Sequence, residues 1–402
     1  MHRWYSFIAG FSPEFVSVCI HRAGGSSQDS LLLDPFAGCG TSLVEANLHG
    51  VTSIGFEPHP FFADMATAKL TFPTNQTQCD TIEGIATRAF EEPVNPEDVW
   101  ETHALTFLRK LVPSSELPVF ASACILEATV PSDLRLFYRM TISQVLERCC
   151  LSQTDGIYKA PSTSKRSDPF LYGLKAVLGQ LRTDIGLLAS NWTNRATLIR
   201  HTSEHMTEVP SDTCTLCVTS PPYLNNFDFA EMTRMELYFW RYAGDWRGIT
   251  ETVRRNLLVN TTTAPTDLKL AQKEFRALVP PTSVSTLENT VSLLASRRSE
   301  RAGKKDYHLL VFPYFGQLTT ILRETFRVLK AGGELHLVVA DSALYGIHIQ
   351  TEAILAGIAT AIGFAPITVQ RLRSRGDRWV LHKRQGPPIG PLGEFHIEAV
   401  KP

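Results

Sequence analysis

Residues 31–41 read Leu-Leu-Leu-Asp-Pro-Phe-Ala-Gly-Cys-Gly-Thr. The uninterrupted apolar run at 31–33 is typical of a strand that is buried on both faces of a parallel sheet. It ends at a turn with two glycines, after which residues 41–48 have a helical pattern that stops at Gly50. The run Thr-Ser-Ile-Gly-Phe-Glu at 52–57 predicts a second strand. Together these pieces predict one βαβ unit, and open parallel sheets bind ligands where such a strand turns into its helix.

The same alternation continues along the rest of the chain. Short β-rich runs at 196–199 and 214–219 and a buried run at 334–339 predict further strands. An amphipathic stretch from Leu318 to Leu329 predicts a helix, and a last α/β pair is expected between Thr351 and Val369. Strands that alternate with helices in this way predict an α/β fold with a doubly wound, Rossmann-like parallel sheet.

Two stretches interrupt this alternation. From 73 to 194 the sequence has helical segments separated by Pro- and Ser-rich breaks, which predict a helical insertion. The main domain would then have two parts, residues 1–72 and 195–402. Between 245 and 306 the periodicity is weak, so this segment is either a second insertion or a long loop.

The composition is that of an ordinary globular protein. The chain has 402 residues, of which 44% are hydrophobic and 20% charged, and this excludes collagen, coiled coil and wholesale disorder. The formal net charge is −1, so any binding to a polyanion depends on local basic clusters. Eight cysteines without regular spacing predict free thiols in a reducing compartment. With no signal peptide and no long apolar stretch, we expect a cytoplasmic protein without a membrane partner.

The glycine turn limits which ligand the sheet can bind. A dinucleotide fingerprint has a third glycine, but Leu43 stands at that position, and a phosphate-binding G-x-x-x-x-G-K-[ST] loop is absent. Glu57, at the end of the second predicted strand, is placed to accept hydrogen bonds from two ribose hydroxyls. These features favour a ligand with an adenosine and a short charged arm, and S-adenosylmethionine fits that description.

A second motif directly follows the strand predicted at 214–219, and therefore lies at the same edge of the sheet: Ser220-Pro221-Pro222-Tyr223. The Ser220 hydroxyl and the Pro221 carbonyl can accept hydrogen bonds from an exocyclic amino group, and the two prolines hold these acceptors with little reorganisation. Such bonds localise the nitrogen lone pair for attack on a sulfonium methyl group. Tyr223 offers a flat face on which a base extruded from a duplex can stack.

Together the two motifs resemble those of the amino-directed, S-adenosylmethionine-dependent DNA methyltransferases. Residues 34–41 look like the DPFxGxGT cofactor motif of that family and residues 220–223 like its catalytic (S/D/N)PPY motif. Phe11-Ser12-Pro13, with the helix predicted after it, is similar to the segment that flanks the methionine arm. The resemblance covers about residues 3–66 and 196–369. Ser at the first position of the tetrapeptide is typical of the N4-cytosine enzymes, so the resemblance implies methylation of the N4 amino group of cytosine in a specific DNA sequence.

Two sets of site residues follow from the motifs and the resemblance. The expected catalytic residues are Ser220, Pro221, Pro222 and Tyr223. The expected cofactor-binding residues are Phe11, Ser12, Asp34, Pro35, Phe36, Gly38, Gly40, Thr41 and Glu57. The family often carries an acidic residue after the third strand, against the cofactor adenine, but Ser203 stands at the matching position.

Double-stranded DNA is the expected substrate, at the nucleoid if the source is bacterial. Residues that could dock phosphates or contact a flipped base lie in three places: Arg297, Arg298, Arg301, Lys304 and Lys305; Arg371, Arg373, Arg375, Arg378, Lys383 and Arg384 with Trp379; and Asn225, Asn226, Phe227 and Asp228. Side chains that read base edges would come from 73–194 or from 245–306. The resemblance also implies a restriction-modification role with a cognate endonuclease, and an orphan enzyme fits the sequence equally well.

Three other activities stay open. N6-adenine methylation of DNA uses the same geometry on a larger base, an RNA amino methyltransferase shares the tetrapeptide chemistry, and an inactive DNA-binding regulator would keep the fold.

Two further kinds of chemistry are disfavoured by the sequence. C5-cytosine methylation needs a cysteine nucleophile after a proline, and none of the eight cysteines follows one. No metal is expected, because Cys214 and Cys217 lie on a predicted strand and no third ligand accompanies His201 and His205.

Overall fold

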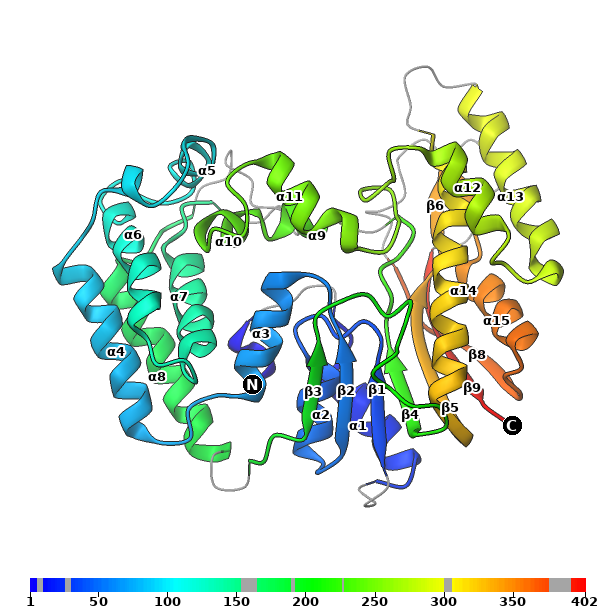
Figure 1. Ribbon diagram of the computed structural model, residues 1–402, viewed down its shortest axis with the longest axis horizontal. Helices are drawn as coiled ribbons and strands as arrows, with labels where there is room; N and C mark the ends of the chain where they lie inside the picture. The colour runs from blue at the N-terminus through cyan, green and yellow to red at the C-terminus, as the bar shows by residue number, and fades with distance from the viewer. Residues whose placement is uncertain are drawn as a thin grey trace.

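A seven-stranded sheet with the order β3-β2-β1-β4-β5-β9-β8 forms the centre of the computed structural model (Figure 1). The structure describes residues 1–5, 10–25, 30–152, 165–188, 192–225, 228–299, 306–375 and 392–402. The strands of the sheet are β1 (Leu31–Asp34), β2 (Thr52–Phe56), β3 (Ala196–Ile199), β4 (Cys214–Thr219), β5 (Leu329–Ala340), β8 (Ile367–Ser374) and β9 (Gly393–Val400). A separate pair is formed by β6 (Ser342–Leu344) and β7 (Ile347–Ile349).

The expected doubly wound α/β sheet is confirmed, with one correction. The pairs β1–β2, β2–β3, β1–β4 and β4–β5 are parallel, as predicted. The last strand, β9, pairs antiparallel with both of its neighbours, β5 and β8, so the sheet is mixed rather than wholly parallel. An antiparallel strand at one side is common in doubly wound sheets.

Helices cover both faces of the sheet. On one face lie α1 (Pro13–Arg22) and α2 (Thr41–Leu48), with α3 (Pro60–Leu70) beside them against β3. On the other face lie α14 (Val311–Val328) and α15 (Thr351–Ile362). Successive strand residues point to opposite faces, so Leu32 packs in the core beneath α1 whereas Leu33 packs in the core beneath α14. Both leucines are fully buried, which explains the continuous apolar run of β1.

A helical region stands beside the sheet, separated from it by α3 (Figure 1). It contains α4 (Gln76–Glu91), α5 (Thr102–Leu108), α6 (Leu117–Leu126), α7 (Arg135–Cys149) and α8 (Phe170–Leu188). Its hydrophobic core extends into three later helices, α9 (Phe229–Met232), α10 (Arg234–Phe239) and α11 (Trp246–Thr252). The Trp100 indole donates a hydrogen bond to the Phe239 carbonyl (2.9 Å), and the Trp240 indole donates one to the Ser143 hydroxyl (2.8 Å). The chain just after the SPPY motif thus belongs to the helical core, and the domain boundaries expected from the sequence stay a prediction.

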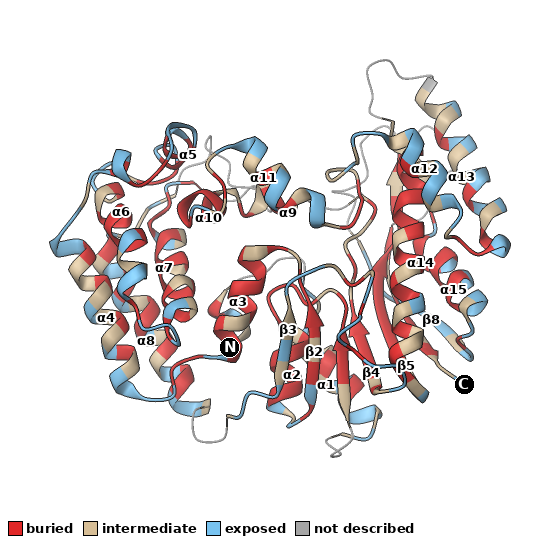
Figure 2. Ribbon diagram, in the orientation of Figure 1, coloured by how far each residue is buried: buried red, intermediate tan, exposed pale blue. Residues whose placement is uncertain are grey.

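The segment 245–306 is largely helical where the structure describes it. After α11 come α12 (Leu268–Arg276) and α13 (Pro281–Ser299), which pack against α14 and α15. Leu287 and Leu294, seven residues apart and on one helical face, are fully buried. Few other positions of these helices are buried, which explains the weak periodicity (Figure 2). The 3-10 helices are His2–Trp4, Pro96–Asp98, Glu127–Thr129, Arg254–Asn256 and Tyr307–Leu310.

A buried ionic network joins the sheet to the helical region. Asp64 on α3 accepts a hydrogen bond from Arg139 on α7, and Arg200, just after β3, forms a second ion pair with Asp64 (2.6 Å). Arg139 also pairs with Glu127 (2.5 Å), so its guanidinium has two carboxylate partners. Paired and hydrogen-bonded charges can be buried at moderate cost, whereas removal of one partner leaves an uncompensated charge. Among the described residues, no helix is both long and apolar enough to cross a bilayer.

Candidate functional site

A cavity of about 990 Å³ opens at the carboxyl edge of the sheet. Its volume is near the upper end of the range for small-molecule sites, about 300–1,000 Å³. The expected catalytic and cofactor-binding residues line it together, with one exception: Phe11, Ser12, Asp34, Pro35, Phe36, Gly38, Thr41, Glu57, Ser220, Pro221, Pro222 and Tyr223. The exception is Gly40. The structure thus brings the two sequence motifs, about 180 residues apart, to one cavity.

The glycine turn needs both of its glycines, for different reasons. Gly38 and Gly40 have φ values of 53° and 82°, which L side chains rarely adopt. The Gly38 N–H donates a hydrogen bond to the Glu57 carboxylate (2.8 Å) at the cavity. Gly40 instead caps α2, and a Cβ atom there would lie 3.0 Å from the Cβ of Ala66 on α3. Gly40 therefore lets α3 pack closely and is not among the residues that line the cavity, and its expected contact with the cofactor stays a prediction.

Asp34 joins the two motifs. It is 1% exposed and accepts hydrogen bonds from the Phe36 N–H (3.0 Å), from the Thr219 hydroxyl (2.6 Å) and from the Ser42 hydroxyl. Thr219 is the last residue of β4, directly before the SPPY motif. Burial raises the pKa of Asp34, and these three donors oppose that effect. Asp34 thus fixes the start of the glycine turn against the start of the tetrapeptide.

Glu57 lies at the floor of the cavity and is 7% exposed. Its carboxylate accepts hydrogen bonds from the N–H groups of Gly38 (2.8 Å) and His59 (2.7 Å). Burial raises its pKa to about 7, although both N–H groups act in the opposite direction. A carboxylate has about four acceptor sites. Glu57 can therefore keep both backbone bonds and still accept hydrogen bonds from a ligand.

The SPPY tetrapeptide is held by side chains from distant parts of the chain. The Tyr314 hydroxyl, on α14, donates a hydrogen bond to the Pro222 carbonyl (3.0 Å). The Tyr223 hydroxyl donates one to Glu394 on β9 (2.9 Å), and Glu394 also accepts from Arg373 on β8 (2.6 Å). Burial and the nearby Glu394 carboxylate raise the pKa of Tyr223, so its phenol stays neutral at physiological pH. The orientation of Tyr223 is thus determined by the last two strands of the sheet.

The Tyr223 ring makes a cation–π contact with an arginine side chain. The Arg375 guanidinium lies over the ring, 5.2 Å from its centroid. Guanidinium planes and nucleobases are both flat and delocalised, and both stack on aromatic faces. The tyrosine is therefore oriented so that at least one face of its ring is open to such a group.

Several cavity residues were not predicted as site residues. They come from β9 (Glu394), from α14 (Gln317 and Ile321), from the 255–258 segment and from the loop after β3 (Glu204). Glu204 is one position beyond Ser203, and both line the cavity, so an acidic side chain is present there after all. Arg373 and Arg375 were singled out only as basic residues. Glu394 lies 171 positions from Tyr223 in the sequence, so no local signal could have identified it.

Other predicted contacts are directed elsewhere. The Asn225 side chain accepts a hydrogen bond from Ser342 (3.2 Å), and Asp228 caps α9 and pairs with Arg254. Neither residue lines the cavity. Several named residues lie outside the described parts of the chain: Asn226, Phe227, Arg301, Lys304, Lys305, Arg378, Trp379, Lys383 and Arg384.

The cysteines and His201 have the following surroundings. All eight cysteines are free and buried. Burial raises the pKa of Cys214 to about 11 and also raises that of Cys217, so neither is a reactive thiolate. His201 is exposed and pairs with Glu208 (2.7 Å).

Comparisons with known proteins found relatives by sequence, including two Type II methyltransferases. No protein-family model matches the chain. The chain is 24% identical to the Type II methyltransferase M.BsoBI of Geobacillus stearothermophilus, over 93% of this chain and 81% of that protein. It is also 24% identical to the Type II methyltransferase M.AvaI of a Nostoc species, over 90% of this chain and 79% of that protein. These similarities cover about nine-tenths of this chain and support the expectation of a methyltransferase.

A solved structure of an S-adenosylmethionine-dependent methyltransferase from Methanosarcina mazei was also found. It is 11% identical, with a TM-score of 0.30, over 95% of this chain and 96% of that one. Because this score is low, the fold assignment rests on the strand order and strand directions described above.

Proposed function

We propose that this protein is an S-adenosylmethionine-dependent DNA methyltransferase that transfers a methyl group to the N4 amino group of cytosine. The observation that carries the proposal is the joining of both motifs in one cavity, where Thr219 donates a hydrogen bond to Asp34 (2.6 Å). The similarity to Type II methyltransferases over about nine-tenths of the chain supports the same class of reaction.

The residues on one side of the cavity fit the cofactor. Glu57 has acceptor capacity left for ribose hydroxyls, and Ser203 and Glu204 line the wall where an adenine would lie. Phe11 and Ser12, before α1, would hold the methionine arm. When bound, S-adenosylmethionine supplies an electrophilic methyl group on a sulfonium. The acidic side chains on this side suit that positive charge.

The tetrapeptide supplies what the target amino group needs. The lone pair of an exocyclic amino nitrogen is delocalised into the ring. Two hydrogen-bond acceptors for the amino group favour localisation of that lone pair on the nitrogen. Ser220 and the Pro221 carbonyl are these acceptors, and the hydrogen bond from Tyr314 to Pro222 holds their loop in place. After methyl transfer the nitrogen carries a positive charge and readily loses a proton, so the mechanism needs no strong base. No cysteine lines the cavity among the described residues, which supports amino-directed over C5-directed chemistry.

Tyr223 is the proposed stacking platform for the target base. An amino group inside a duplex cannot reach a buried cofactor, so the base must be extruded. The Arg375 guanidinium over the Tyr223 ring occupies the kind of position that a flat base would take. Stacking does not distinguish cytosine from adenine, so the preference for cytosine rests on Ser220 and its resemblance to the N4-cytosine enzymes.

Arginines flank the cavity on two sides and favour a nucleic acid partner. Arg255 lines it from the segment after α11, and Arg373 and Arg375 line it from the end of β8. Arg373 is 71% exposed, although it is paired with Glu394. Phosphate contacts of this kind position a duplex without reading its sequence. The Type II relatives further favour a restriction-modification role with a cognate endonuclease, in the cytoplasm.

The proposal is tested by incubating the purified protein with methyl-labelled S-adenosylmethionine and unmethylated duplex DNA. The DNA is then digested to nucleosides and examined by mass spectrometry. We expect labelled N4-methylcytosine, both from the native protein and from the control variant Arg88→Gln, which lies on α4 outside the cavity. Labelled N6-methyladenine would show that the target base is adenine, and label in RNA alone would show that the substrate is RNA. Cofactor binding without any transfer would favour an inactive binding protein.

A further inference from the structure

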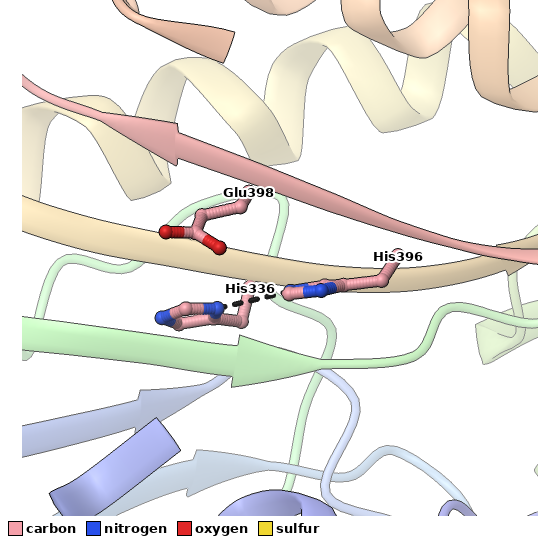
Figure 3. A group of neighbouring side chains, drawn as sticks. All are labelled: His336, His396 and Glu398. Carbon is pink, nitrogen blue, oxygen red and sulfur yellow. Dashed lines mark hydrogen bonds between the residues drawn. The ribbon is translucent and has the colours of Figure 1, made fainter. Parts of the chain in front are cut away.

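A second group of titratable side chains lies on the sheet face that α1 covers. His336 is on β5, and His396 and Glu398 are on the neighbouring antiparallel strand β9. In the register, His336 pairs with Glu398 and Val338 pairs with His396, so the three side chains share one face. Their ligand atoms all lie within 4.8 Å of one another (Figure 3). The proposed methyl transfer uses none of these residues.

A carboxylate orients the buried histidine of this group. His336 is fully buried, and its Nε2 lies 3.0 Å from the Glu334 carboxylate. A carboxylate can only accept here, so Nε2 carries the proton and Nδ1 presents its lone pair. That Nδ1 atom lies 3.0 Å from Nε2 of His396 (Figure 3). Histidine ligands in metal sites are typically oriented by a carboxylate on the other ring nitrogen in this way.

The two histidine nitrogens fit a tetrahedral ion after a small movement. With Zn–N bonds of about 2.0–2.1 Å, two nitrogens of a tetrahedral site lie about 3.3 Å apart. The observed separation of 3.0 Å therefore has to widen by a few tenths of an ångström. Glu398 offers a carboxylate oxygen as third ligand, and a water molecule could complete the site. Two histidines and one glutamate form a common protein ligand set for Zn²⁺.

The surroundings favour a cation. Glu334 and Glu398 are both nearby carboxylates. Arg22 of α1 contacts this group, and its guanidinium lies 2.8 Å from Glu398. The Arg22 side chain is 54% exposed, so it can move into solvent when an ion binds.

We propose that His336, His396 and Glu398 form a binding site for Zn²⁺ or a similar first-row divalent metal. The edge of the Phe15 ring contacts the His396 ring (5.1 Å between centroids), and Phe15 also lines the cavity. A bound ion would hold β9 to β5 behind the part of the cavity that Phe15 lines. The role is structural, because the group itself does not line the cavity.

The test is a titration of the full-length protein with Zn²⁺ after removal of metals, followed by calorimetry, with Co²⁺ as a spectroscopic probe. We expect one ion per chain. Replacement of the orienting carboxylate in Glu334→Gln should weaken Zn²⁺ binding by about 10- to 100-fold. His396→Gln should weaken it more, since it removes a ligand. The matched control is His201→Gln, which removes a histidine from an exposed His–Glu pair elsewhere and should bind as the native protein does.

The Arg22→Gln variant distinguishes a metal site from a group that is joined only by hydrogen bonds. Removal of Arg22 frees Glu398 and should tighten Zn²⁺ binding several-fold, although it removes an ion pair. Unchanged or weaker binding in Arg22→Gln would overturn the proposal. So would the absence of binding to the native protein, or native affinity in His396→Gln. If His396→Gln does not fold, Glu398→Gln gives the same test, because that side chain is 25% exposed and its loss leaves both histidines in place.

Discussion

The two sides of the cavity are built by different means. On the side proposed to bind the cofactor, the backbone of the turn and the buried Glu57 are joined by hydrogen bonds, such as that from Gly38 (2.8 Å). On the opposite side, Tyr223 is held by Glu394 and Arg373, which come from strands near the end of the chain. The first side is buried and determined by backbone conformation, whereas the second is partly exposed and determined by side chains.

This difference indicates how each side should respond to change. A backbone turn with positive φ values has few alternatives, so substitutions there should cost stability or cofactor affinity. A side-chain network can lose one bond and retain the others, so substitutions there should lower turnover without loss of cofactor binding. Four predictions follow this division, in order of decreasing effect.

Tyr223→Ala should have the largest effect, on turnover alone. Base stacking on an aromatic side chain contributes about 1–3 kcal/mol, and the variant also loses the bond to Glu394. We expect methyl transfer to fall by about 100-fold or more, while cofactor affinity measured by calorimetry stays unchanged. Native turnover in this variant would exclude a stacking role, and weaker cofactor binding would remove the distinction between the two sides.

Gly40→Ala should lower stability. The substitution forces a side chain into the left-handed region, which costs about 1–2 kcal/mol, and places its Cβ 3.0 Å from that of Ala66. We expect a lower melting temperature by scanning calorimetry. The control is Gly84→Ala in α4, where a Cβ meets nothing within 4 Å, and this change should preserve or raise the melting temperature.

Glu57 should make cofactor affinity depend on pH. Its pKa is raised to about 7, and the ionised form is the one that accepts hydrogen bonds from ribose hydroxyls. Affinity should therefore fall below pH 7, by at most about tenfold per pH unit. Without cofactor, the folding stability depends on pH in the opposite direction. Because the pKa of Glu57 is raised in the folded state, its contribution to stability is present below about pH 4.5 and is lost as the pH rises to about 7.

Calorimetric titrations between pH 5.5 and 8.5 check this dependence. Glu57→Gln should bind the cofactor weakly with a flatter pH profile, whereas Glu208→Gln, at an exposed position outside the cavity, should follow the native profile. A native profile in Glu57→Gln would assign the pH dependence to another group.

Tyr223→Phe should have the smallest effect. The ring stays, and one hydrogen bond to Glu394 is lost, for which we expect turnover to fall about 3- to 10-fold. Glu394→Ala, which removes the acceptor, should cause a similar loss. Because both substitutions act on one interaction, the double variant should be little worse than either single one. Additive losses in steady-state kinetics would show that Glu394 acts independently of Tyr223.

Much of the fold could be predicted because its signals are local. The bounds predicted for α2, β3 and β4 agree with the structure, since an apolar run, a glycine turn and a cap are each encoded within about ten residues. The segment 245–306 could not be assigned, because α12 and α13 bury only a few positions each. The reversed direction of β9 also escaped prediction, since no local pattern specifies the direction in which a strand pairs.

The sequence by itself determined the βαβ unit and the glycine turn, and it supplied the chemistry that we propose for Ser220 to Tyr223. In each case the residue types constrain the backbone or supply the reacting groups directly. Only the tertiary structure decided that Glu394 orients Tyr223, that Gly40 serves the packing of α3, and that His336 meets His396. These contacts join positions 171, 26 and 60 residues apart. They depend on which strands and helices become neighbours, and that is decided by the packing of the whole chain.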